Sequence, residues 1–146
     1  HKPSQYFHKY IDGPSTPLYP FGFGLSYTRF AYSSLKLSHT RISDKDSFTA
    51  SIELTNVGDR EGTEVVQLYI RDIYSSATRP VKELKDFARV TLKPGEKKTV
   101  TFTVTPDKLA YWNRNMQYGV EKGEFEIMIG SSSQDKDLKK VKMEVL

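Results

Sequence analysis

The chain has 146 residues, a net charge of +4 from 22 basic and 18 acidic side chains, and no cysteine. The lack of cysteine excludes a disulfide scaffold. Because 37% of its residues are hydrophobic, a chain of this length can bury a core without disulfides or metals, which excludes a disordered chain. The mild charge argues against a nucleic-acid partner, and no apolar run approaches the ~20 residues that cross a membrane.

The first predicted segment, residues 1–28, is an extended arm. It shows no helical or strand period, and four prolines interrupt it, namely Pro3, Pro14, Pro17 and Pro20. It nevertheless carries ten large apolar side chains, whereas a flexible linker is rich in glycine and serine. We therefore predict that the arm is strapped against a protein surface.

Within the arm, the stretch "GFG" places glycines at positions 22 and 24. A dinucleotide-binding fingerprint needs a third glycine where this chain has Tyr27, and a phosphate-binding P-loop needs a lysine that is missing here. We interpret Gly22 and Gly24 as positions where the backbone bends or approaches another segment closely, between large aromatic side chains.

From residue 29 to 146 the hydrophobic pattern has a period of two, which predicts half-buried strands. The alternation is clearest in "FTASIELT", "EVVQLYIRD", "TVTFTVT", "EFEIMIG" and "KVKMEVL", and weaker around 32–38 and 83–92. Turn signals such as "NVGDREG" and "KPGEKK" separate these segments, and one short helical turn can start after Thr105 with Pro106 first. Seven or so strands predict an all-β, two-sheet antiparallel sandwich of the fibronectin III or immunoglobulin type over residues 29–146.

No residue pattern in the chain predicts catalysis. The three histidines have no metal-site spacing, a nucleophile elbow is missing, and the carboxylates fall on outer strand faces or in turns. Glycoside hydrolysis needs two carboxylates that converge across a cleft, and nothing in the spacing indicates such a pair. We expect no catalytic residue, no cofactor and no metal site.

Two stretches leave a choice between structural and binding roles. Tyr111, Trp112 and Tyr118 could form an aromatic platform for sugar rings, although a role in the core or in covering the arm is favoured. Alternation makes one of Tyr111 and Trp112 point inward. In the longest predicted loop, residues 71–80, the charged residues Arg71, Asp72 and Arg79 pair with one another or with a neighbouring domain.

Several motifs together resemble a known family. The stretches "TPLYPFGFGLSYTRFAYSSL", "NVGDREGTEVVQLYIRD" and "RPVKELKDF" occur in order, followed by "LAYWNRNMQYGVEKGEFEIMIGSSSQD". They resemble the C-terminal fibronectin III-like domain of glycoside hydrolase family 3 enzymes, the β-glucosidase and β-xylosidase type, over nearly the whole chain. Asp86 departs from the pattern, because the family usually has glycine at that step.

The resemblance implies a noncatalytic structural module that braces the catalytic domains of the same parent chain. Such a parent hydrolyses β-linked glucosides or xylosides with retention, using an aspartate in a barrel domain and a glutamate from a following α/β domain, neither of which lies in this sequence. The expected interdomain contacts are Tyr19, Phe21, Phe23 and Tyr27. A homodimer is a further expected option, and family analogy suggests a periplasmic or secreted parent. The alternative is a carbohydrate-binding module built around Trp112.

Overall fold

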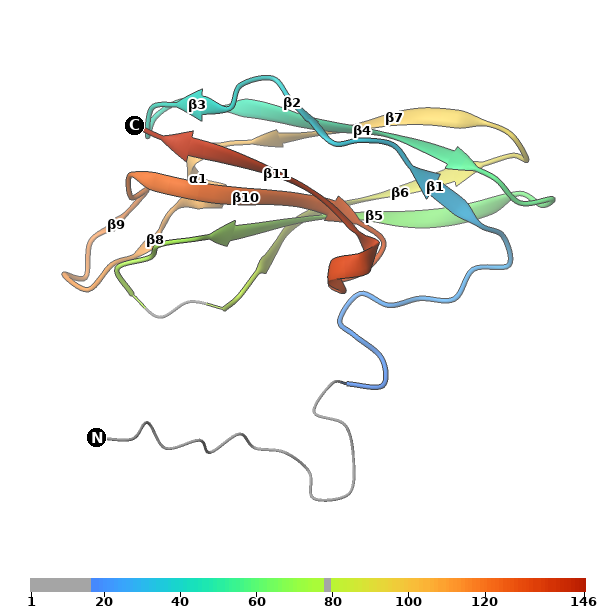
Figure 1. Cartoon of the computed structure of the whole chain (residues 1–146), viewed down its shortest axis with the longest axis horizontal. Coiled ribbons are helices and arrows are strands. Elements are labelled where there is room, and N and C mark those ends of the chain that lie inside the picture. The colour runs from blue at the N-terminus through green and yellow to red at the C-terminus, as the bar shows by residue number, and fades with distance from the viewer. Residues whose placement is uncertain (1–16, 78–79) are drawn as a thin grey trace, which may run out of the picture.

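The structure, a computed structural model, describes residues 17–77 and 80–146 and is a sandwich of two sheets (Figure 1). Sheet A contains β1 (Phe30–Tyr32), β2 (Lys36–Leu37), β4 (Phe48–Asn56) and β7 (Lys97–Val104). Sheet B has the order β3 (Arg41–Ile42), β11 (Leu138–Val145), β10 (Gly123–Gly130), β5 (Gly62–Asp72) and β6 (Glu83–Leu92). The predicted all-β sandwich is therefore confirmed.

Pairing is antiparallel except between β3 and β11, which run parallel. A two-stranded hairpin of β8 (Tyr111–Trp112) and β9 (Tyr118–Gly119) extends from one end of the sandwich. The helical turn predicted after Thr105 is α1 (Pro106–Leu109), and a second short turn, η1 (Asp135–Asp137), precedes β11. Among the described residues no helix has the length and apolar character needed to cross a membrane.

The strand predicted around residues 32–38 is divided in two, since β1 and β2 both pair with β4. Between them the Ser33 hydroxyl accepts a hydrogen bond from the backbone N–H of Glu53 at 2.9 Å. A side-chain oxygen therefore takes the place of a carbonyl in the ladder, which interrupts the regular pairing. The two-residue strands β3 and β9 carry too few residues for a periodic signal and were not predicted.

The core lies between the two sheets, where alternate residues of the long strands meet. In β4, Ile52 and Leu54 face inward, and they pack in one cluster with Leu68 of β5 and Ile127 of β10. All four side chains are almost completely buried. Each such side chain contributes roughly 1.5–3 kcal/mol of hydrophobic stabilisation relative to leaving it exposed.

Strand β5 departs from the predicted alternation because residues 66–70 are buried on both faces. Val66, Leu68 and Ile70 point into the core, while Gln67 and Tyr69 point to the outer face of sheet B. Tyr69 forms a small second cluster there with Met128 and Leu138. Gln67 and Tyr69 are shielded from water on the outer face because residues 17–28 and the loop after β10 approach it. Figure 1 shows residues 17–28 on this side of the sandwich.

Candidate docking site

Hydrogen bonds hold the backbone of the arm against the outer face of sheet B at Phe21 and Gly22. The Gln67 side chain donates from Nε2 to the Gly22 carbonyl oxygen at 3.0 Å and to the Ser131 carbonyl oxygen at 2.7 Å. The backbone N–H of Ser133 donates to the Phe21 carbonyl oxygen at 2.9 Å. These bonds join three segments that are distant in sequence: the arm, β5 and the loop after β10.

The Gln67 amide is itself held by a buried neighbour. The Tyr69 hydroxyl donates to Gln67 Oε1 at 2.6 Å, and the two residues are 1% and 4% exposed. Burial raises the pKa of the Tyr69 hydroxyl, which keeps it protonated as a donor. Because buried polar groups are costly without partners, this network fixes where the arm crosses the sheet.

Gly22 is required at the crossing point, as the sequence predicted for a bend or close approach. Its φ of 77° lies in the left-handed region, and a Cβ atom there would collide with the Gln67 side chain and lie 2.9 Å from the Tyr69 hydroxyl oxygen. Gly24 is different, because a Cβ atom at that position would meet nothing within 4 Å. The backbone of this chain therefore requires glycine at position 22 and leaves space for a side chain at position 24.

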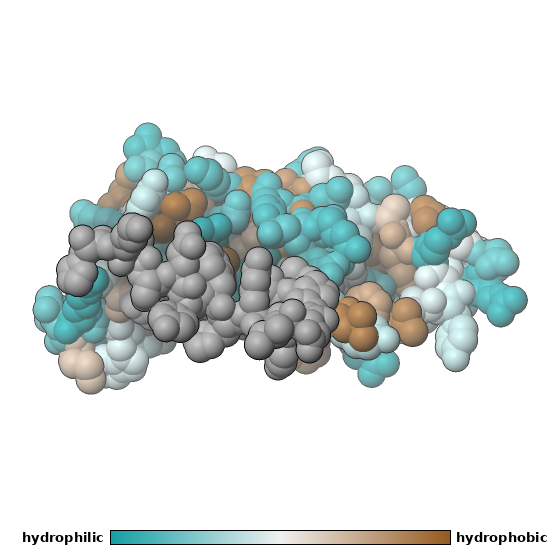
Figure 2. Space-filling view, turned by 60° about the horizontal axis from the view of Figure 1, so that its bottom comes forward, coloured by the Kyte–Doolittle hydropathy of each residue, from teal (hydrophilic) through white to brown (hydrophobic). Residues whose placement is uncertain are grey.

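The arm is held by its backbone, and its large side chains remain exposed. The predicted contact residues Tyr19, Phe21, Phe23 and Tyr27 are 67%, 66%, 44% and 94% exposed. The rings of Tyr19 and Phe23 lie 5.5 Å apart between centroids, so aromatic side chains gather on this surface. Figure 2, turned toward this side of the molecule, shows hydrophobic side chains in brown at the surface among hydrophilic ones. The remaining apolar arm residues of the prediction, between positions 6 and 11, lie outside the described residues.

A groove of about 560 Å³ runs between the arm and the strands beside it. Leu25 of the arm, Val65 of β5 and Leu84 of β6 contribute apolar walls, and all three side chains are exposed. Phe87 of β6, which is 60% exposed, pairs in register with Gln67 and so lies on the same face of sheet B. We call the exposed apolar side chains of the arm and of this face the docking surface; its members are Leu18, Tyr19, Phe21, Phe23, Leu25, Tyr27, Val65, Leu84 and Phe87.

One carboxylate lines the groove. Glu64 of β5 accepts a hydrogen bond at Oε1 from the Tyr32 hydroxyl of β1, at 3.0 Å. Burial raises the pKa of Glu64, and the hydrogen bond from Tyr32 opposes that shift. The pair joins the edge of sheet A to sheet B beside the arm.

A second set of hydrogen bonds, centred on Asn56, holds the arm where it leads into β1. Asn56 is completely buried, and its Oδ1 accepts hydrogen bonds from the Thr28 hydroxyl at 2.8 Å and from the Gly58 N–H at 3.0 Å. Its Nδ2 donates to the carbonyl oxygens of Arg60 at 2.7 Å and Leu92 at 2.9 Å. One side chain thus ties the end of the arm to the turn before β5 and to the end of β6.

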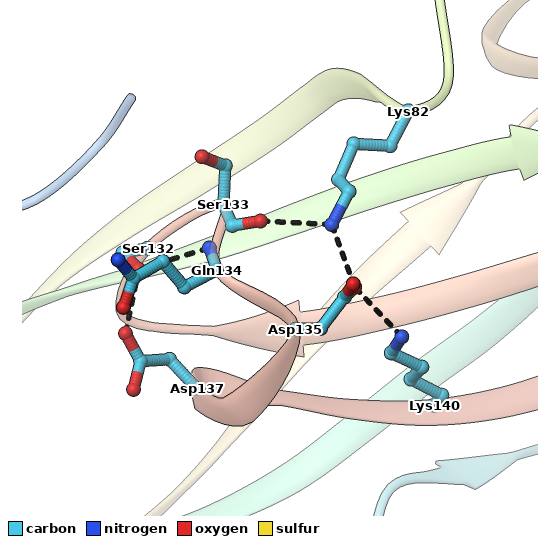
Figure 3. Close-up of polar contacts among 7 residues, drawn as sticks. All are labelled: Lys82, Ser132, Ser133, Gln134, Asp135, Asp137 and Lys140. Atoms are coloured by element: carbon cyan, nitrogen blue, oxygen red, sulfur yellow. Dashed lines mark hydrogen bonds and ion pairs between the residues drawn. The ribbon is translucent and has the colours of Figure 1, made fainter. Parts of the chain in front are cut away.

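The loop that receives the arm is held by an ion-pair cluster, drawn in Figure 3. Lys82, from the "RPVKELKDF" stretch, donates from Nζ to the Ser133 carbonyl oxygen and to Asp135 Oδ1, both at 2.8 Å. Lys140 of β11 donates to the same Asp135 oxygen at 2.8 Å. These contacts lower the pKa of Asp135 to about 2, chiefly through the hydrogen bonds from Lys140 and Lys82.

The cluster predicts a pH-dependent contribution to stability. The folded-state pKa of Asp135 lies below its ordinary value of 3.8, so its contribution is complete above pH 3.8 and is lost as the pH falls through about 2. Because the Asp135 side chain is 74% exposed, solvent screens the pairs, and we expect D135N to lower the free energy of unfolding at pH 7 by only about 0.5–1 kcal/mol. Urea unfolding at several pH values should show this difference shrinking between pH 4 and 2. A difference that grows toward low pH would contradict the assignment.

The predicted aromatic residues at the hairpin are separated by the structure. Tyr111 is 9% exposed and points inward, as alternation allowed, while Trp112 and Tyr118 are 60% and 57% exposed. Trp112 is therefore not part of the core, because β8 is in a hairpin that extends beyond the sandwich, while the inward position of Tyr111 agrees with the core role favoured for one of the two residues. The rings of Trp112 and Tyr118 are 5.5 Å apart but tilted by 52°, so the pair does not form one flat surface.

The loop after β5 is tied to the same end of the sandwich. Ser76 Oγ donates to Glu121 Oε1, and the Ser76 N–H lies 3.3 Å from the Tyr111 hydroxyl oxygen. Asp72 accepts a hydrogen bond from the Tyr74 N–H at 3.1 Å, and Arg79 of the predicted charge pairing lies outside the described residues. Over the described ranges, no group of three or more His, Asp and Glu side chains is placed to hold a metal ion.

Sequence reasoning missed the residues that hold the arm, above all Gln67, Asn56 and Lys82. Gln67 occupies an outward position in an alternating strand, which predicts contact with water. A signal was nonetheless present, because "VQLY" places two large side chains with polar ends, Gln67 and Tyr69, on the outward face beside a run of apolar residues. Asn56 was read only as part of a turn.

Comparisons with known proteins find relatives over most of the chain. Residues 64–133 match the model of the fibronectin type III-like domain. The chain is 48% identical to a periplasmic β-glucosidase from Salmonella typhimurium over 132 residues, which is 90% of this chain and 17% of that protein. It is 49% identical to a β-xylosidase from Formosa agariphila over 137 residues, which is 94% of this chain and 19% of that protein.

Solved structures show the same relationship. A β-glucosidase from Erythrobacter marinus matches 97% of this chain with a TM-score of 0.89 and 41% identity, over 18% of its own length. A β-glucosidase from Listeria innocua in complex with glucose matches 97% of this chain with a TM-score of 0.88 and 36% identity, over 19% of its length. The chain thus spans less than a fifth of the length of each of these four proteins.

Proposed function

The chain carries a fibronectin type III-like domain of the kind found in the β-glucosidases and β-xylosidases of glycoside hydrolase family 3, and from this premise we propose that it braces the catalytic domains of one longer chain. The relatives are much longer than this chain, so it sits beside other domains in the same polypeptide. The parent hydrolyses terminal β-linked glucosides or xylosides, and this module adds no reacting group.

The observation that carries the proposal is the orientation of the arm. Its backbone is fixed by Gln67 and Ser133, while the side chains of Phe21 and Phe23 remain 66% and 44% exposed. Exposed apolar patches of this kind mark interaction surfaces. A fastened backbone also lowers the conformational entropy that docking must overcome. The docking surface therefore suits a permanent contact with the catalytic domains.

The groove supports a noncatalytic role. Retaining glycosidases place two carboxyl groups about 5–5.5 Å apart. Glu64 is the one acidic side chain among the described residues that line the groove, and it accepts a hydrogen bond from the Tyr32 hydroxyl. The two catalytic carboxylates of the proposed parent belong to its other domains.

The finer features of the parent follow from its relatives. One of them is named as a periplasmic enzyme, which favours a periplasmic or secreted parent. The exposed side chains of Tyr74, Trp112 and Tyr118 offer a further apolar surface for a homodimer. A carbohydrate-binding role for Trp112 is not favoured, because the tilt between its ring and that of Tyr118 leaves no shared plane for a sugar to stack on.

An activity assay tests the proposal. The isolated chain is expected to hydrolyse an aryl β-glucoside and an aryl β-xyloside no faster than buffer, while the parent polypeptide hydrolyses at least one of them. The catalytic parent serves as the positive control under the same conditions. Turnover by the isolated chain that survives repeated purification would overturn the noncatalytic role.

A further inference from the structure

Glu64 is an acid without a basic partner beside the docking surface. Within the described ranges no ion pair joins it to a lysine, an arginine or a histidine, and its hydrogen-bond donor is the Tyr32 hydroxyl. Asp135, which is far more exposed, has two lysines in contact. The more buried carboxylate is therefore the one whose charge is not compensated.

Two acidic side chains influence the Tyr32 hydroxyl at this end of the groove. The pKa of the Tyr32 hydroxyl is raised first by burial, and the charges of Glu64 and Asp137 add to that shift. Asp137 accepts a hydrogen bond from the Ser132 hydroxyl at 2.7 Å, a neutral donor that does not cancel its charge. Two acids thus act on one hydroxyl, and a cation that enters the groove would be attracted.

Docking would make this charge costly. Phe23, Leu25, Val65 and Leu84 line the same groove as Glu64, so a domain that covers these apolar side chains also removes water from the carboxylate. A buried carboxylate is strongly unfavourable unless a cation or several donors compensate it. Tyr32 is bonded to Oε1, which leaves Oε2 available to a second donor.

We propose that Glu64 receives a lysine or arginine side chain from the catalytic part of the parent chain, which enters the groove between the arm and β5. This inference rests on the proposed function, since it names the chemistry of the surface that the module docks against. The occupant is the remaining polypeptide, because the matched relatives devote more than four fifths of their length to other domains. The ion pair orients the module, while the apolar docking surface supplies most of the buried area.

The test compares E64Q in the parent polypeptide and in the isolated chain. Glutamine keeps an oxygen that accepts the Tyr32 hydrogen bond and replaces the charged carboxylate with a neutral amide of nearly the same shape, so the isolated chain should change its midpoint temperature of unfolding by less than about 1 °C. In the parent the unpaired cation is left buried, and the midpoint for this module should fall by about 5 °C. E61Q removes an exposed carboxylate three residues earlier and should change neither protein.

The other outcomes of this comparison would overturn the ion pair, the docking role or both. An unchanged or higher midpoint for E64Q in the parent would overturn the inference, since Glu64 would then dock uncharged or stay in water. An equal fall in both proteins would overturn it too, because the partner would lie within this chain. F23A in the parent separates the two proposals: if F23A destabilises the parent and E64Q does not, docking stands and the ion pair fails. If neither substitution has an effect, the proposed function fails as well.

Discussion

Replacing Asn56 by alanine is expected to lower the free energy of unfolding of the chain by about 3 kcal/mol. The Asn56 side chain is completely buried and makes four hydrogen bonds, two as donor and two as acceptor. Alanine removes all four and leaves the Leu92 carbonyl oxygen and the Thr28 hydroxyl without these partners in the interior. Such buried polar groups each cost about 1–3 kcal/mol when they lose a partner without gaining water.

Urea unfolding of the isolated chain measures this effect, and T28V is the matched control. Valine keeps the shape of threonine and removes one of the four hydrogen bonds, so T28V should cost about 1 kcal/mol. If N56A proved no more destabilising than T28V, Asn56 would not be the central connection that its hydrogen bonds indicate. A reduced slope of unfolding free energy against urea would instead show that the compactness of the native or the denatured state has changed.

Removing the rings of Phe21 and Phe23 together is expected to loosen the arm in the parent but not in the isolated chain. Burial of a phenylalanine side chain contributes roughly 1.5–3 kcal/mol, and a loss of ~3 kcal/mol after partial compensation corresponds to a factor of ~100 in the opening equilibrium. In the isolated chain the rings are 66% and 44% exposed, so their loss changes little.

Hydrogen–deuterium exchange of the Ser133 amide reads this opening directly, because that amide donates to the Phe21 carbonyl oxygen. We expect exchange about 100-fold faster in the F21A/F23A parent and less than about 3-fold faster in the isolated variant. Tyr74→Ala, which removes an exposed ring outside the arm, should leave the Ser133 amide unchanged in both proteins. Equal acceleration in the two contexts would mean that the rings stabilise the arm only within this chain.

The strands and the fold class could be predicted because period-two alternation is a local property of the sequence. Phe48, Ala50, Ile52 and Leu54 face the core in β4 as that pattern required. The interior side of Tyr111 could also be predicted, because it depends on strand geometry, and the sequence predicted a bend or close approach at Gly22 without indicating that Gln67 and Tyr69 lie there.

The docking site could be predicted only in part, because the hydrogen bonds that hold the arm and its loop join residues far apart in the chain. Gln67 and the arm are separated by 45 positions, and Lys82 and Ser133 by 51, so neither contact leaves a local pattern. Outward alternation predicts that Gln67 contacts solvent, whereas the arm and the loop after β10 cover it. The exposed position of Trp112 likewise depends on the hairpin of β8 and β9. Its two-residue strands are too short to give a periodic pattern in the sequence.

The most direct measurement is hydroxyl-radical footprinting of the arm in the parent polypeptide and in the isolated chain, with the modified side chains identified by mass spectrometry. Phe21, Phe23, Leu25 and Tyr27 should be labelled readily in the isolated chain, where they are exposed, and several-fold less in the parent. Tyr74 provides an internal reference outside the docking surface. Equal labelling of the four arm residues in both proteins would show that no domain covers the arm, and the bracing role would be wrong.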